Sequence, residues 1–263
     1  ERLLTSLTDA EVDDALAAAG LRRPDGPPPP GPTAELMPEI SAAPFEVLSG
    51  HSVDHVFATW YEADRQSSIL VVVDVSGSMS APASSPLIDV VADGISALAD
   101  EMPDGSDLAL WEFASLLDPP RDYLTLVERA PLDEAQRGRV EAVVGALDAG
   151  ASGTGLYDST LAAYLSAQAA YRSGVPNHVI VFTDGKNEDD LETITIEQLT
   201  EQLVAAQDPE RPVALTLVLF GPEPQKDLLE AALEPVDADV EALESPEQVR
   251  PLFIHLAAGG VHH

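Results

Sequence analysis

Oxygen-bearing side chains gather in three short segments of this sequence. The first is residues 74–78, Asp-Val-Ser-Gly-Ser, which carries such a side chain at every second position. The second is the glycine-rich loop 150–155, and the third is residues 183–185, Thr-Asp-Gly. Alternate side chains of an extended chain point to the same side, so the three oxygens of the first segment can face one ligand.

The residue types in these segments favour a hard divalent cation. Asp74 and Asp184 each follow an apolar run, where an ionised carboxylate is costly unless something compensates its charge. Three hydroxyls, those of Ser76, Ser78 and Thr154, complete the set, and the chain has no cysteine. A donor set of oxygens alone suits Mg²⁺, with Ca²⁺ or Mn²⁺ as alternatives, and does not suit zinc. We therefore expect one divalent cation at these residues.

The surrounding sequence predicts the elements that would position these segments. Residues 69–73 form a continuous apolar run, typical of a strand covered on both faces. Further strands are predicted at 107–114, 121–127, 178–182, 213–220 and 239–243, and helices at 87–102, 133–147, 156–172, 197–207, 225–233 and 246–258. This alternation predicts an α/β fold with a doubly wound, mostly parallel central sheet and helices on both faces. Binding groups gather at the carboxyl edge of such a sheet, so we expect the site there, between the first and fourth strands.

Together, the three segments resemble the metal-ion-dependent adhesion site of von Willebrand factor type A domains, which have a Rossmann-like fold. The strings ILVVVDVSGSMS, GTGLYDS and VIVFTDG are similar to those of bacterial members, and the resemblance covers residues 65–258. It implies that Ser76 and Ser78 bind the metal directly. It also implies that Asp74 and Asp184 act directly or through water. Thr154 would be a direct ligand in the ligand-ready state.

The resemblance implies a protein-binding module and not an enzyme. In the family, an acidic side chain of a partner protein fills an open position on the metal. One alternative is an assembly subunit that works with an AAA+ ATPase, as in chelatase-type relatives; this sequence has no phosphate-binding loop of its own. A weaker alternative is metal-assisted hydrolysis at Asp74 and Asp184, for which the motif loops offer no evident general base.

Two parts of the chain are predicted from its composition. Residues 1–66 are expected to form a helical extension with a proline-rich linker at 24–44, the tail of a preceding domain, and residues 67–260 the type A domain. The string LTDAEVDDALAAAGLRRPDG resembles the end of the solute-binding domain of actinobacterial envelope proteins that also carry a type A domain. This resemblance favours the cell envelope or the extracellular space over the cytoplasm. The apolar stripe around Trp60 is expected to be buried.

The charge of the chain excludes two classes of partner. With 46 acidic and 13 basic residues, the formal net charge is -33, which would repel nucleic acid and anionic membranes. No apolar run approaches the roughly 20 residues of a membrane span, so we expect no direct membrane insertion. The acidic residues 188–190 and 192 are expected to form a solvated loop, with a second cation or a basic partner as the alternative.

Overall fold

The computed structural model describes residues 66–150, 153–185, 187, 193–220, 226–243, 248 and 252. Four predictions fall wholly or mostly outside these residues: the helical extension with its proline-rich linker, the burial of Trp60, the acidic loop 188–192 and the closing helix 246–258. The described helices include none that is long and apolar enough to span a membrane.

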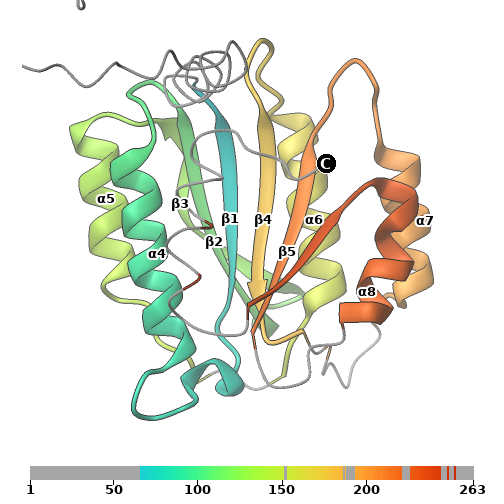
Figure 1. Cartoon of the computed structure of the whole chain (residues 1–263), viewed down its shortest axis with the longest axis horizontal. Coiled ribbons are helices and arrows are strands. Elements are labelled where there is room, and N and C mark those ends of the chain that lie inside the picture. Colours follow the sequence, from blue (N-terminus) through green and yellow to red (C-terminus); the bar gives the residue numbers. More distant parts are fainter. Residues whose placement is uncertain are drawn as a thin grey trace, which may run out of the picture. The chain divides into compact units, whose positions relative to one another are not determined.

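A six-stranded sheet forms the centre of the described part, with the order β3-β2-β1-β4-β5-β6 (Figure 1). The strands are β1 (Ser68–Asp74), β2 (Asp107–Asp118), β3 (Arg121–Pro131), β4 (Asn177–Thr183), β5 (Ala214–Phe220) and β6 (Asp239–Leu243). All neighbouring strands run parallel except β2 and β3, which form an antiparallel hairpin at one edge. The predicted fold class is confirmed, and the predicted strand at 121–127 is part of this antiparallel edge strand β3.

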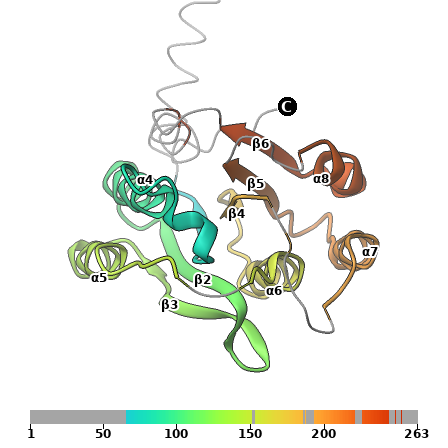
Figure 2. The same cartoon turned by 90° about the horizontal axis from the view of Figure 1, so that it is seen from below.

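Helices cover both faces of this sheet. They are α4 (Leu87–Glu101), α5 (Glu134–Val144), α6 (Leu156–Ala169), α7 (Ile196–Ala206) and α8 (Lys226–Leu233), with short 3-10 helices η2 (Gly77–Ser80) and η3 (Glu234–Val236). In Figure 2, α4 and α5 lie on one side of the sheet, and α6, α7 and α8 lie on the other. Two separate apolar cores result, one on each face.

The central strands divide their side chains between these two cores. All seven residues of β1 and all seven of β4 are buried, which explains why the middle of each strand, 69–73 and 179–182, is apolar at every position and does not alternate. Along β1, Val71 and Val73 contribute to the core under α4, whereas Leu70 and Val72 contribute to the core under α6. Trp111 and Phe113 of β2 are likewise buried in the core under α6.

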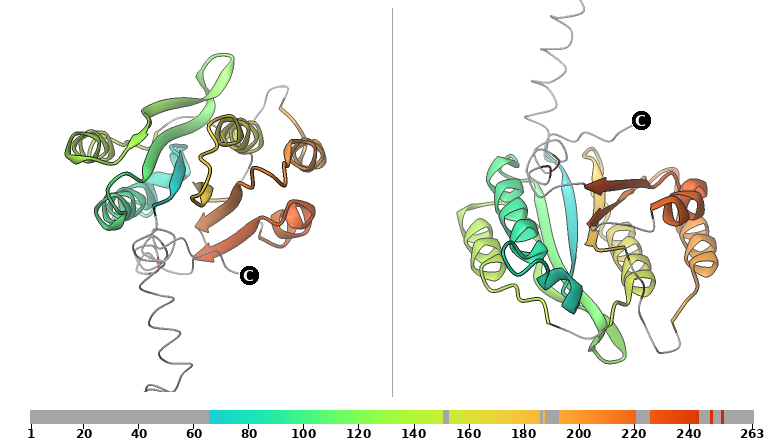
Figure 3. Two further views of the ribbon diagram at one scale, coloured as in Figure 1. Left: turned by 90° about the horizontal axis from the view of Figure 1, so that it is seen from above. Right: turned by 60° about the horizontal axis from the view of Figure 1, so that its bottom comes forward.

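The β2–β3 hairpin extends further than the sequence predicts. The prediction ends β2 at residue 114, but the strand continues to Asp118, and β3 continues to Pro131. The pairing between the strands is irregular from Phe113 to Asp118, and Leu116 within this stretch has a left-handed backbone with φ of 52°. A bulge of this kind breaks the alternation of apolar and polar residues, which explains why the prediction stopped early. Figure 3 (right) shows the hairpin, in green, projecting beyond the carboxyl ends of the parallel strands.

Candidate functional site

The first candidate ligand, Asp74, is the last residue of β1 and is fully buried. Its Oδ1 accepts a hydrogen bond from the backbone N–H of Ser76 at 2.8 Å. Its Oδ2 accepts one from the hydroxyl of Thr183 at 2.6 Å, and Thr183 ends the neighbouring strand β4. The carboxylate is therefore held between the ends of β1 and β4, at the edge where the sequence predicts the site.

The electrostatic environment of Asp74 disfavours its ionised form. Burial raises the pKa of Asp74 to about 6, hydrogen bonds from Ser76 and Thr183 oppose this rise, and the nearby charge of Asp184 adds to it. No cation of the described residues appears among the groups that act on this carboxyl. At neutral pH the site therefore carries a buried negative charge that, among the described residues, hydroxyl and amide dipoles stabilise.

Two predicted ligands follow in the turn after β1. The hydroxyl oxygens of Ser76 and Ser78 lie 3.1 Å apart and share a hydrogen bond, which confirms that these alternate side chains point to the same side. Ser76 is buried, whereas Ser78 belongs to the 3-10 helix η2 and is exposed. Two adjacent hydroxyls, one facing the interior and one facing solvent, lie next to the buried carboxylate.

Thr154 lies in the segment 153–155 that precedes α6, and it is buried. The loop that carries it is attached to the site by the backbone of Gly150, whose N–H donates to the carbonyl of Val75 at 3.1 Å. Gly153 adopts a positive φ of 76°, and its carbonyl accepts from the N–H of Ser115 in β2 at 3.4 Å. The loop is therefore fixed both to the end of β1 and to the β2–β3 hairpin.

Asp184, the last predicted ligand, follows β4 and is half-buried. It lies close enough to Asp74 for its charge to raise the pKa of that residue. The tight turn after it uses Gly185, with φ of 86°, whose N–H donates to the Thr183 hydroxyl at 3.2 Å. A positive φ of this size favours glycine, so local backbone geometry explains the glycine of the Thr-Asp-Gly string.

Sequence reasoning missed the roles of two polar residues at this edge. Thr183 belongs to a quoted motif, but its hydrogen bond to Asp74 spans 109 positions of sequence and could not be inferred from spacing. Asp122, near the start of β3, is only 9% exposed, and its Oδ1 accepts from the N–H of Leu116 at 2.7 Å. Its Oδ2 lies against Gly155, where an added β-carbon would come within 2.5 Å. No motif marks Asp122; only the hairpin places it there.

The donor set at this edge fits a hard cation better than a soft one. It consists of carboxylate and hydroxyl oxygens, which suit Mg²⁺, Ca²⁺ or Mn²⁺. Within the described ranges, no group of three or more histidine, aspartate or glutamate side chains is placed to hold a metal. A cation at this edge would therefore depend on serine and threonine hydroxyls in addition to the two aspartates.

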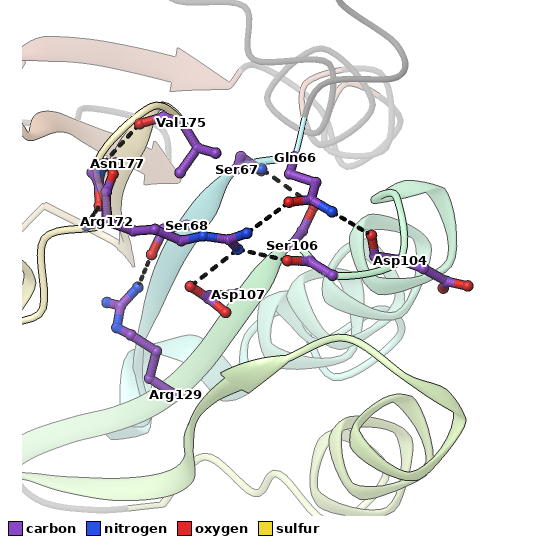
Figure 4. A network of polar contacts seen from close by, with 11 residues as sticks. Gln66, Ser67, Ser68, Asp104, Ser106, Asp107, Arg129, Arg172, Val175 and Asn177 are labelled. Atoms are coloured by element: carbon purple, nitrogen blue, oxygen red, sulfur yellow. Dashed lines mark hydrogen bonds and ion pairs between the residues drawn. The ribbon is translucent and has the colours of Figure 1, made fainter.

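The opposite, amino edge of the sheet carries a different polar cluster (Figure 4). Arg172 donates to the carbonyl of Gly105 and to Gln66 Oε1, each at 2.6 Å, and lies 3.3 Å from Asp107 Oδ2. Arg129 donates to the hydroxyl of Ser68 at 2.5 Å. Here arginines of the chain itself form hydrogen bonds and an ion pair with the polar groups at the amino ends of the strands.

Comparison with known proteins places this arrangement in a family. The family model for the von Willebrand factor type A domain matches residues 68–236. An uncharacterized protein of Mycobacterium tuberculosis (strain H37Rv) is 25% identical over 252 residues, which cover 92% of this chain and 36% of that protein. The chain thus spans about a third of the length of this curated relative, a distant homologue.

Solved structures show the same fold. A von Willebrand factor type A protein from Catenulispora acidiphila is similar with a TM-score of 0.59 and 18% identity, covering 74% of this chain and 42% of that chain. The pilus adhesin SpaC from Lactobacillus rhamnosus GG is similar with a TM-score of 0.56 and 14% identity, covering 74% and 30%. Domains of this family are often protein-binding or adhesion modules, are usually non-catalytic, and often bind a divalent cation. With more than half of its residues matched by the family model, this chain belongs to the von Willebrand factor type A domain family.

Proposed function

We propose that this chain is a metal-dependent protein-binding module. Asp74, Ser76, Ser78, Thr154 and Asp184 would hold one divalent cation, Mg²⁺ by preference, with Ca²⁺ or Mn²⁺ as alternatives. The ion would supply the positive charge that attracts an acidic side chain of a partner protein. The residues of the chain would fix the ion's place at the carboxyl edge of the sheet.

One observation carries this proposal: the state of the Asp74 carboxyl. It is fully buried, its pKa is raised to about 6, and a second carboxylate and two adjacent serine hydroxyls lie beside it. Burying a negative charge without a cation is unfavourable, and a divalent ion at the neighbouring hydroxyls would remove that cost. Metal binding would then displace the proton that burial favours, so affinity for the ion should fall below about pH 6.

The proposed module is part of a larger arrangement. We propose that residues 1–66 form an extension ahead of the type A domain at 67–260, and that a solute-binding domain precedes them in the full-length protein at the cell envelope. The mycobacterial relative, of which this chain spans 36%, has ample length for such a domain. No step of catalysis is assigned to any residue.

The proposal is tested by calorimetric titration of Mg²⁺ into the chain, followed by partner capture with and without chelator. Asp74→Ala should abolish Mg²⁺ binding and chelator-sensitive capture, because the ion loses a principal source of negative charge. Asp100→Ala, which removes an exposed carboxylate from α4, is the matched control and should behave as the parent. Equal Mg²⁺ binding by the parent and Asp74→Ala would contradict the proposed site.

Thr154→Ala separates metal binding from partner binding. The variant should retain Mg²⁺ with weakened affinity and should lose partner capture to a greater extent, because this threonine would contact the ion in the ligand-ready state. The captured protein also decides the kind of module, since an AAA+ ATPase would indicate an assembly subunit. Loss of both activities in equal proportion would assign Thr154 the same role as Asp74.

A further inference from the structure

The β2–β3 hairpin contacts the loop that carries Thr154 at two points. These points are the two ends of the short segment 153–155. At the first end, the carbonyl of Gly153 accepts from the N–H of Ser115 in β2. At the other end, Gly155 lies against the carboxyl group of Asp122 in β3. Thr154 lies between these two contacts, so its position depends on the hairpin.

Asp122 links the two strands of the hairpin at this point. Its Oδ1 accepts from the N–H of Leu116, which stands on the opposite strand in a left-handed conformation. A leucine adopts this conformation only at an energetic cost, so the surrounding contacts must hold it in place. Leu116 is 44% exposed, so burial of its side chain does not supply much of that support. The Asp122 carboxyl fixes the bulge on one side and packs against Gly155 on the other.

The contact between Asp122 and Gly155 also explains why the loop has glycine at this position. A β-carbon at residue 155 would lie 2.5 Å from Asp122 Oδ2 and 2.6 Å from both Asp122 Cβ and Cγ. These distances are far below van der Waals contact, and the carboxyl is buried and bonded to Leu116, so it cannot move aside without breaking that bond. Gly155 is therefore required by Asp122.

We propose that Asp122 is a positioning residue of the metal site. It fixes the β2–β3 hairpin against Gly153 and Gly155, and the hairpin in turn sets the position of the Thr154 hydroxyl. This inference rests on the proposed metal-binding function. Residues that orient metal ligands from outside the coordination sphere typically contribute 10- to 100-fold in metal affinity. Asp122 acts by packing against Gly155 and by accepting the hydrogen bond from the N–H of Leu116.

The test has two independent readouts on the whole chain. The first is amide hydrogen exchange, without metal, in a peptide that contains residues 153–156. Asp122→Ala should increase exchange there by roughly tenfold or more, because the segment loses its support, and Asp122→Asn should stay near the parent because its amide oxygen can still accept from Leu116. Unchanged exchange in Asp122→Ala would overturn the proposal, whatever the metal does.

The second readout is the affinity for Mg²⁺ alone, measured by calorimetry. Asp122→Ala should weaken binding by about tenfold or more and Asp122→Asn by less than about threefold. The control is Asp118→Ala, which removes a half-buried carboxylate that pairs with Arg121 in the same hairpin and should bind as the parent does. Equal losses in Asp122→Ala and Asp122→Asn would assign the effect to charge and overturn positioning. A parent that binds no Mg²⁺ would refute the proposed function, while the exchange result would still decide the role of Asp122 in holding the loop.

A double variant sharpens the assignment. Gly155→Ala should weaken Mg²⁺ binding as Asp122→Ala does, because its methyl group would displace the carboxyl. If both act on the same contact, combining them should cost much less than the sum of the single effects. Additive losses would show that Gly155 and Asp122 act separately, and would contradict the proposal.

Discussion

The two ends of the β1 strand bury polar groups in opposite ways. At the amino end, Ser68 and the neighbouring Asp107 are matched by Arg129 and Arg172. At the carboxyl end, the described partners of Asp74 are hydroxyls and a backbone amide, with another carboxylate nearby. Within the described part of the chain, one end of this strand is therefore paired with arginines, whereas no described arginine or lysine acts on the carboxylate at the other end.

Three of the few basic residues of the described part act at the amino edge of the sheet. Of the seven arginines and lysines among the described residues, Arg129, Arg137 and Arg172 donate to groups at the amino edge, where they hold Gln66, Asp104 and the turn at Gly105. A satisfied network of this kind rigidifies the fold. The buried carboxylate of Asp74 at the carboxyl edge lowers the stability of the metal-free fold. A bound cation would restore that stability.

The largest expected effects are two pH dependences of opposite sign in the metal-free protein. Asp74 has a native pKa of about 6 against 3.8 for the free group, so stability is lost as pH rises through this range. His178 at the start of β4 is buried, and its pKa is lowered to about 4 from 6.5, so stability is lost as pH falls through that range. Each pKa shift corresponds to a change in unfolding free energy on the order of 3 kcal/mol.

The measurement is urea unfolding between pH 4 and pH 7 in the presence of chelator. Relative to the parent, Asp74→Asn should gain stability as pH rises, and His178→Gln should gain stability as pH falls. His178 donates or accepts with the hydroxyl of Thr216 at 2.8 Å, so the glutamine can keep a polar partner. If the unfolding free energy of the parent and of a variant changed with pH in parallel, the substituted residue would not be the source of the pH dependence.

The next effect concerns the ion itself. Mg²⁺ at a hundredfold excess over its Kd should stabilise the parent by about 2.7 kcal/mol, because a ligand that binds only the native state shifts the unfolding equilibrium. Asp74→Asn should gain almost nothing, although it can still accept from the Ser76 N–H. Melting curves with and without Mg²⁺ for both proteins give the result. Arg172→Ala provides the comparison, since a variant at the amino edge should retain the full shift.

Breaking the amino-edge network should have a smaller effect that Mg²⁺ does not change. Arg172→Ala removes hydrogen bonds to Gly105 and Gln66 and leaves Asp107 without this partner, which should cost about 2 kcal/mol. Arg211, whose pairing with Asp208 is largely exposed, is the matched control, and Arg211→Ala should unfold near the parent midpoint. A denaturant midpoint for Arg172→Ala equal to that of Arg211→Ala would show that the network contributes no stability.

The smallest effect tests the backbone beneath that network. Gly105 has a φ of 81°, and an added β-carbon would lie 2.5 Å from Gln66 Nε2, so Gly105→Ala should destabilise by about 1 kcal/mol. Gly138, within α5, has open space around it, and Gly138→Ala should stabilise by a similar amount. Thermal unfolding of the two variants should move in opposite directions. A shift of the same sign in both would exclude backbone conformation as the cause.

Much of the carboxyl edge could be predicted because its signals are local. An apolar run of strand length ending in Asp74, and hydroxyls at alternate positions after it, are patterns within a few residues. The partners of those residues could not be predicted, because the Thr183 hydroxyl reaches Asp74 only after β1 and β4 pair. Asp122 was missed for a similar reason: the bulge that aligns it with Leu116 depends on hairpin register, which the sequence pattern leaves open.

The amino edge was less predictable than the carboxyl edge. Its contacts are made by arginines, whose long side chains reach groups far away in the sequence, as Arg172 does when it bonds to Gln66 across 106 positions. No local pattern reports such a contact.

The end of β2 was predicted too early, at residue 114, because two consecutive leucines interrupt the alternation of its side chains. The strand continues to Asp118.

The hydrogen bond from Thr183 to Asp74 has a consequence for the order of folding. It joins two strands that are neighbours in the sheet through residues 109 positions apart, with β2, β3, three α-helices and the 3-10 helix η2 between them in the chain. Pairings of such long range close late, because the chain entropy of the intervening loop must be lost first. An ion that requires both strand ends cannot assist the early steps. It would act on the finished sheet, slowing its unfolding far more than it speeds its formation.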